Sequence, residues 1–251
     1  MATLQSDSAL SVPAAKPALR HSALVRVTHW IITLCFFALL LSGIELVISH
    51  PRFYWGETGT VMDKPLFQLH IPSSRKMVPT GYNYVLPDAN GWSRALHFEA
   101  AWIVVLTGLL YVIYGFVSRH FRKDLLPSKA DFSWREFWTA FVKPFRFRRP
   151  TATESSSYNV VQRITYLFVI FVLFPLVIWS GLAMSLAFAS AFPWSVTLLG
   201  GQQSARTIHF FVSLALTLFL VVHVLMVFLS GFWSRTAAMI TGRAGARKER
   251  T

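Results

Sequence analysis

Residues 206–223 read RTIHFFVSLALTLFLVVH, and this stretch decides the fold class. After Arg206 it contains no Asp, Glu, Lys or Arg, and the apolar run continues to about Trp233. A helix needs about 20 consecutive apolar residues to cross the ~30 Å hydrocarbon core of a bilayer. The segment 206–233 therefore predicts a transmembrane helix that carries two histidines.

Three other segments show the same pattern, and we place their spans at about 24–49, 93–118 and 161–184. Only 14% of the chain is charged, whereas a soluble domain of ordinary composition has about 25%. We expect an all-α integral membrane four-helix bundle over residues 21–234. Residues 183–205 are also uncharged, but Pro193 and the Gly200–Gly201 pair favour a loop there over a fifth span. No internal repeat is evident beyond the general similarity of apolar segments.

The charges alternate between the two sides of this bundle. Eighteen of the 24 Lys and Arg residues lie in residues 1–26, 119–163 and 235–251, which predicts that these segments are cytoplasmic. Residues 1–20 then form a flexible cytoplasmic arm, and residues 235–251 form a basic cytoplasmic tail. The connection from about 50 to 92 becomes a long periplasmic loop. The net charge of +13 follows from this topology, so we expect the lipid bilayer as a partner and no nucleic acid.

Four histidines lie within the spans. His29 is near the inner end of its span, while His97 and His209 are near the outer ends of theirs. His223 follows His209 by 14 residues, which is about 21 Å along a helix and nearly four whole turns. Depth therefore pairs His97 with His209 and His29 with His223. Two imidazoles that face each other across a bundle are the axial ligands of a b-type haem, so the sequence predicts two haem b groups.

Other chemistry fits the sequence less well. The chain has one cysteine, Cys35, so it can form neither an internal disulfide nor a covalent c-type haem attachment. A zinc site would need a third and fourth ligand at the depth of each pair, and no Cys, Asp or Glu is placed to provide them. We identify no catalytic residue in the chain itself.

Arginines and glycines accompany the histidines. Arg26, Arg94 and Arg206 each precede a ligand histidine by three residues, which places both side chains on one helix face. A guanidinium there can pair with a haem propionate, or it can extend to the interface as lysines and arginines at helix ends do. Gly43 and Gly108 lie at the predicted haem depths. They can make room for a macrocycle or allow close packing of helices.

The chain resembles the bacterial di-haem b-type cytochromes. This family includes the b subunits of nickel–iron hydrogenases, the γ subunit of formate dehydrogenase, thiosulfate reductase b subunits and small cytochromes b561. The similar residues are the sequence RVTHW at 26–30, Ser42–Gly43, the His209/His223 helix, and the third-span set Tyr158, Asn159, Gln162, Arg163, Tyr166, Pro175 and Ser180–Gly181. The resemblance covers about residues 26–233 without most of the outer loop.

This resemblance implies a multi-pass protein of the bacterial inner membrane. It implies an electron-transfer subunit of an oxidoreductase, with quinone near the inner haem and a periplasmic redox enzyme near the outer haem. Asn159, Gln162 and Arg163 are then candidates to line the quinone pocket, although helix capping and a positive cytoplasmic flank explain them as well. The long outer loop favours a docked partner, such as a molybdenum enzyme or a hydrogenase, over a solitary cytochrome.

Two other functions stay open from the sequence. The chain can be a stand-alone cytochrome b561-type quinone oxidoreductase that oxidises a small periplasmic substrate such as superoxide, which Arg75 and Lys76 would attract. It can also be a proton or ion transporter that uses the same histidines without haem. The first would be coloured and the second colourless.

Overall fold

The computed structural model describes residues 22–60, 62–71, 78–79, 85–86, 91–126, 160–229 and 231–242. Within these residues, four helical segments are long and apolar enough to cross a membrane, so the predicted fold class is confirmed. They are α1 (Ala23–Ser49), α2 (Gly91–Val117), the segment Val160–Met184 and α9 (Gln202–Leu229). The predicted arm at 1–20 lies outside the described residues, as do His21, Arg75 and Lys76.

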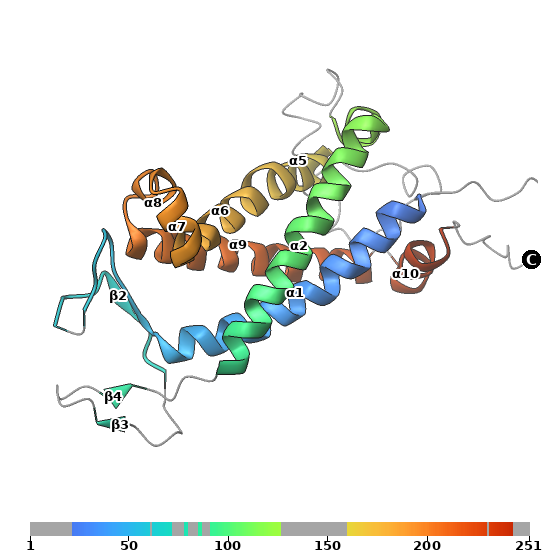
Figure 1. Cartoon of the computed structure of the whole chain (residues 1–251). Coiled ribbons are helices and arrows are strands. Elements are labelled where there is room, and N and C mark those ends of the chain that lie inside the picture. Colours follow the sequence, from blue (N-terminus) through green and yellow to red (C-terminus); the bar gives the residue numbers. More distant parts are fainter. Residues whose placement is uncertain are drawn as a thin grey trace, which may run out of the picture.

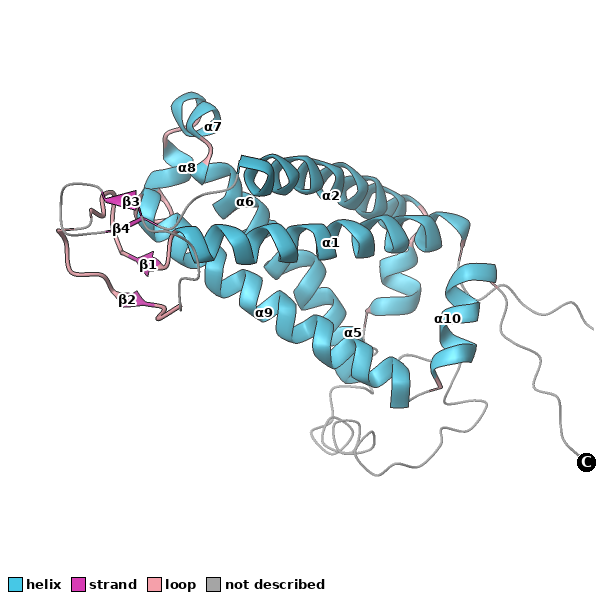
Figure 2. Ribbon diagram, turned by 90° about the horizontal axis from the view of Figure 1, so that it is seen from below, coloured by secondary structure: helices cyan, strands magenta, loops and turns pink. Residues whose placement is uncertain are grey.

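The helices pack as two pairs, α1 with α2 and α6 (Phe174–Met184) with α9 (Figure 1). The strands and the short helices α7 (Leu186–Ala191) and α8 (Trp194–Thr197) lie at one end of the bundle, and α10 (Phe232–Thr241) lies at the other (Figure 2). We name these the outer end and the inner end, following the orientation that the charge pattern predicts. Small hydroxyl side chains are buried in the bundle and at its outer end, among them Ser42, Ser93, Ser180 and Ser204. Small residues allow close helix contact in lipid, where apolar burial drives association only weakly.

The third span is not a uniform α-helix. It consists of α5 (Val160–Phe168), a π-helical turn η4 (Val169–Leu173) and α6 (Phe174–Met184). The wide turn comes directly before Pro175, which lies in the first turn of α6. Proline has no N–H and its ring clashes with the carbonyl four residues earlier. The π turn adds one residue and lets the helix continue across this point.

Between the third and fourth spans the chain forms short helices instead of a fifth span. These are α7 (Leu186–Ala191) and α8 (Trp194–Thr197), both much too short to cross a bilayer. Gly200 and Gly201 follow with φ angles of 82° and 112°. Only glycine adopts such conformations without strain, so the pair reverses the chain before α9.

The first connection forms two small antiparallel hairpins at the outer end. Strand β1 (Arg52–Phe53) pairs with β2 (Phe67–Gln68), and β3 (Val78–Pro79) pairs with β4 (Val85–Leu86). Phe53 is almost fully buried. Its ring stacks on Phe67 with centroids 4.6 Å apart, and the tilted ring of Phe210 on α9 lies 4.5 Å away. The first hairpin is thus attached to the fourth span by aromatic contacts.

The same connection caps the start of α9. The Gly56 carbonyl accepts from the N–H groups of Gln203 and Ser204, and Glu57 accepts from the N–H of Gln202 at 3.2 Å. Deeper in, the hydroxyl of Thr207 donates to the Tyr54 carbonyl at 2.7 Å. The first N–H groups of a helix have no partner within it, and a carboxylate there also favours the helix dipole.

The inner end differs from the predicted boundaries. The fourth helix ends at Leu229 and not near Trp233, because Gly231 has a φ of 100° and turns the chain. A separate helix, α10 (Phe232–Thr241), follows where a tail was expected from residue 235. Trp30 on α1 donates to the Met239 carbonyl at 3.2 Å, which fixes α10 against the start of α1. At the same end, α2 leads into a π-helical turn, η1 (Phe121–Leu125).

Candidate functional site: two facing histidine pairs

The structure brings His97 on α2 and His209 on α9 together near the outer end. Their ring centroids are 6.2 Å apart and the ring planes are inclined by 61°. The pair joins the two halves of the bundle, because α2 packs with α1 and α9 packs with α6. We call His97 and His209 the outer pair.

A second pair lies near the inner end. The ring centroids of His29 on α1 and His223 on α9 are 6.4 Å apart, with an angle of 52° between the planes. The His223 ring also stacks at 5.7 Å on Phe219 and meets the edge of Tyr166 at 6.4 Å. We call His29 and His223 the inner pair.

The spacing of both pairs fits one metal ion held between two imidazoles. A metal–nitrogen bond to histidine is about 2 Å, and the ring centroid lies about 1 Å further along that line, so two axial imidazoles have centroids about 6 Å apart. Two imidazoles supply only the axial ligands, and a haem supplies the other four. Among the described residues, no three His, Cys, Asp or Glu side chains gather into a site that binds a bare metal ion.

Each ring of the outer pair is held at its Nδ1 atom by a serine of a neighbouring helix. The Oγ of Ser42 lies 2.9 Å from Nδ1 of His97, and the Oγ of Ser180 lies 3.1 Å from Nδ1 of His209. The Val177 carbonyl lies 3.0 Å from Nδ1 of His209 as well. In the sequence, both serines stand out only as part of the family resemblance. Their role has no local signal, because the residues in contact are 55 and 29 positions apart.

The glycines next to these serines contact the same rings. A Cβ on Gly43 would lie 3.6 Å from Cε1 of His97, and a Cβ on Gly181 would lie 3.2 Å from Cε1 of His209. A Cβ on Gly108 would meet no described atom within 4 Å. In this structure Gly43 and Gly181 therefore give room to the imidazole rings, while clearance for a macrocycle at Gly43 and Gly108 stays a prediction.

The three predicted arginines have different surroundings. Arg26 is half-buried and donates through Nη1 to the Ile240 carbonyl of α10, and its Nε is buried without a hydrogen-bond partner among the described residues. Arg206 donates to the His50 carbonyl and lies 4.9 Å from the Phe53 ring centroid. Arg94 is exposed and lies 5.9 Å from the Phe98 ring centroid.

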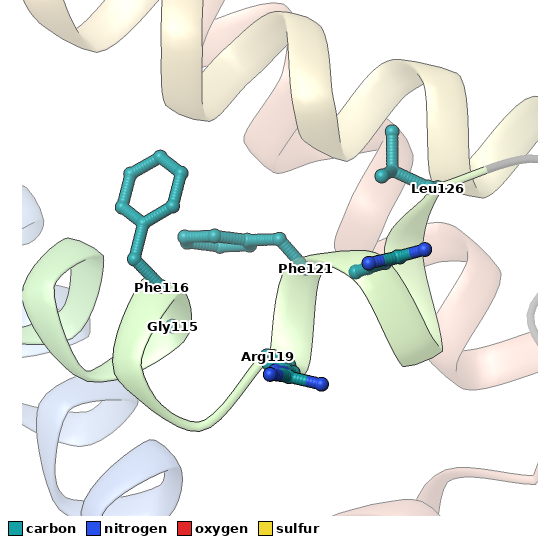
Figure 3. Close-up of a pocket in the computed structure, with 6 residues that line it drawn as sticks. Gly115, Phe116, Arg119, Phe121 and Leu126 are labelled. Atoms are coloured by element: carbon teal, nitrogen blue, oxygen red, sulfur yellow. The ribbon is translucent and has the colours of Figure 1, made fainter.

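Two of the three predicted quinone residues lie within the described part of the chain. Asn159 lies outside the described residues, whereas Gln162 and Arg163 lie in the first turn of α5, both half-buried. A separate pocket of about 270 Å³ lies where α2 ends and η1 begins. Its apolar side chains are Phe116, Phe121 and Leu126, and Arg119 and Arg122 line it as well (Figure 3). Neither Gln162 nor Arg163 lines this pocket.

Comparison with known proteins identifies the family of the chain. A family model described as prokaryotic cytochrome b561 matches residues 20–242, which is most of the chain. A protein of Azospira oryzae named "Putative protein-methionine-sulfoxide reductase subunit YedZ1" is 29% identical over 212 residues. That alignment covers 82% of this chain and 89% of the relative. The predicted family is thereby confirmed.

Proposed function

The chain belongs to the prokaryotic cytochrome b561 family, and on that premise we propose that it transfers electrons between quinone and a periplasmic oxidoreductase by means of two b haems. Members of this family bind b-type haem in the membrane. The observation that carries the proposal is the pair of histidine couples, with ring centroids 6.2 and 6.4 Å apart. In each couple the imidazoles would hold one haem iron as axial ligands.

The spacing of the two pairs supports electron transfer across most of the bilayer. His209 and His223 share one face of α9 and are separated along its axis by about 21 Å, at 1.5 Å per residue. When bound, haem supplies an iron that alternates between ferric and ferrous states. The chain supplies the ligands, their spacing and a surround of low polarity that influences the redox potential.

Charged groups support the placement of the haem propionates. The buried Nε of Arg26 favours Arg26 as the propionate partner of the inner haem, because a buried guanidinium nitrogen without a partner is costly. Arg94 and Arg206 are the corresponding residues at the outer end. Arg206 also engages the His50 carbonyl, so it would bridge the outer loop and the haem.

Quinone would bind near the inner pair, and the partner near the outer pair. We assign Gln162 and Arg163, together with Asn159, to the quinone site, since they lie at the start of the third span on the basic side of the chain. The hairpin of β1 and β2, which is fixed on α9, would form part of the docking surface. From the charge pattern we propose that both termini lie in the cytoplasm and that the chain lies in a bacterial inner membrane.

The relative's name supports a partner enzyme. That protein is named as a reductase subunit, so by analogy the electrons here would run from quinol at the inner end to an enzyme at the outer end. We propose a molybdenum enzyme or a hydrogenase-type enzyme as the class of partner. The analogy also favours a subunit over a stand-alone superoxide-oxidising cytochrome.

The test is the haem content of the purified chain and of single histidine variants. We expect two b haems per chain, with the outer haem lost in His97→Ala and His209→Ala and the inner haem lost in His29→Ala and His223→Ala. The exposed His70 gives the matched control, and His70→Ala should keep both haems. A colourless protein would overturn the proposal in favour of a transporter. Full activity of the isolated chain on superoxide would overturn the proposal that the chain works with a partner enzyme.

A further inference from the structure

We propose that Ser42 and Ser180 are positioning residues of the outer haem, which fix the tautomer and orientation of its two axial histidines and lower its redox potential. The inference rests on the proposed function in one respect, namely that the outer pair holds a haem iron. Each serine lies on a different helix from the histidine that it contacts. Ser42 on α1 contacts His97 on α2, and Ser180 on α6 contacts His209 on α9.

The direction of the Ser42 hydrogen bond follows from proton counting. A serine hydroxyl carries one proton. The Oγ of Ser42 lies 2.7 Å from the Ala38 carbonyl, which only accepts, so this proton points to Ala38. At 2.9 Å from the same oxygen, Nδ1 of His97 must then be the donor.

Ser180 repeats the arrangement. Its Oγ donates to the Leu176 carbonyl at 2.7 Å and lies 3.1 Å from Nδ1 of His209. The Val177 carbonyl, 3.0 Å from Nδ1, also only accepts. Both contacts require a proton on Nδ1. In a neutral imidazole the lone pair is then on Nε2, which is the atom left to bind iron.

The two arrangements come from separate halves of the chain that are built alike. In each half a Ser–Gly pair near the outer end of one helix contacts a histidine in an Arg-x-x-His sequence near the outer end of the next. The halves are Ser42–Gly43 with Arg94–His97, and Ser180–Gly181 with Arg206–His209. Since the same serine–histidine contact arises at two places distant in sequence, an incidental contact does not explain it.

The repeat continues toward the inner end. Arg26-Val-Thr-His29 corresponds to Arg163-Ile-Thr-Tyr166 in the second half, and Tyr111 stands 14 residues after His97 as His223 does after His209. From His29 to Ser42 is 13 residues, whereas from Tyr166 to Ser180 is 14. The π turn η4 accounts for the extra residue. The inner pair thus consists of His29 from the first half and His223 from the second, and the equivalent position in the other half is a tyrosine in each case. The His223 ring packs on Phe219 and Tyr166 and makes no hydrogen bond to a described residue.

The hydrogen bonds have a consequence for the redox potential. Donation from Nδ1 to an oxygen raises the electron density and basicity of a ligating imidazole. A more basic ligand stabilises ferric over ferrous iron, so the potential of the outer haem should be lower than without the serines. A serine with only a structural role provides the comparison. Ser49 is buried on α1 one heptad after Ser42, and its Oγ donates to the Glu45 carbonyl at 3.0 Å without contact to a described histidine ring.

The experiment compares Ser42→Ala, Ser180→Ala and the control Ser49→Ala in the full-length chain. The readouts are a potentiometric titration of each haem, the low-spin ferric EPR signal, and the loss of haem to apomyoglobin. In the first two variants we expect a more positive potential and an altered EPR signal for the outer haem alone. Removal of such a partner costs about 10- to 100-fold in metal affinity, so retention of the outer haem should fall by that order in Ser42→Ala. The fall should be smaller in Ser180→Ala, because the Val177 carbonyl still accepts from Nδ1 of His209. Ser49→Ala should match the wild type.

The inner haem is the internal control for folding. An outer haem with unchanged potential and EPR signal in both serine variants would overturn the assignment. Simultaneous loss of both haems in these variants would overturn it as well, because the serines would then be structural. Failure of the proposed function is a different result, since the wild-type chain itself would then lack two bis-histidine haems.

Discussion

Replacement of Gly181 by alanine tests the geometry of the outer pair most directly. The added Cβ would lie 3.2 Å from Cε1 of His209, while ordinary carbon contacts are about 3.5–4.0 Å, so the ring must move by about 0.3 Å or more. Overpacking of this kind typically costs about 1–3 kcal/mol. Alanine in place of helical glycine returns about 0.5–1 kcal/mol. A net cost of about 1 kcal/mol corresponds to roughly fivefold weaker retention of the outer haem.

Gly43→Ala is the matched comparison on the other helix pair. Its Cβ would lie 3.6 Å from Cε1 of His97, which is an ordinary contact, so only the gain in helix propensity remains. Haem transfer to apomyoglobin, followed at the α-band of the outer haem, measures both variants. We expect faster loss in Gly181→Ala and wild-type retention in Gly43→Ala. Equal losses in the two variants would refute the reasoning from ring contacts and would favour clearance for the macrocycle.

Three further predictions concern the inner haem and the outer connection. Gly108→Ala adds a Cβ that meets no described atom. Reduced content of the inner haem in pigment analysis would therefore mean that the Cβ collides with the haem itself. Full content would exclude a role of Gly108 in clearance for the macrocycle. Thr207→Val removes the buried hydrogen bond to the Tyr54 carbonyl and should lower the free energy of unfolding by about 1–3 kcal/mol in thermal denaturation, unlike Thr217→Val, whose hydroxyl bonds only its own helix. Gly201→Ala combines a φ of 112° with a Cβ 2.4 Å from the Gly56 backbone, and should cost about 1–3 kcal/mol from strain alone. Limited proteolysis of the outer loop should accelerate in that variant, and unchanged cleavage would contradict the contact.

The sequence was sufficient for the spans because hydropathy is a local property. Each predicted span begins and ends within about four residues of a helix in the structure, since a helix satisfies its own backbone in lipid. The absence of a fifth span was also predictable, from the helix-breaking residues between 183 and 205. The end of the fourth helix was not, because Gly231 in an apolar context gives no sign of the positive φ it adopts.

The relation between the two halves is not evident from the sequence for an identifiable reason. The similarity rests on a few polar positions, and the π turn before Pro175 shifts their spacing by one residue. The connections also differ in length, since Arg94 follows Ser42 by 52 residues and Arg206 follows Ser180 by only 26. The structure makes the correspondence visible because Ser42 and Ser180 contact equivalent rings.

From the amino-acid order alone follow four membrane-spanning helices, the depth of each histidine and hence its partner, since rise and rotation per residue are constant along a helix. Only the tertiary structure decided which side chains hold the Nδ1 atoms of His97 and His209, and that the β1–β2 connection caps α9. These contacts join residues far apart in the chain. They depend on the rotation and approach of packed helices, which local sequence periodicity does not specify.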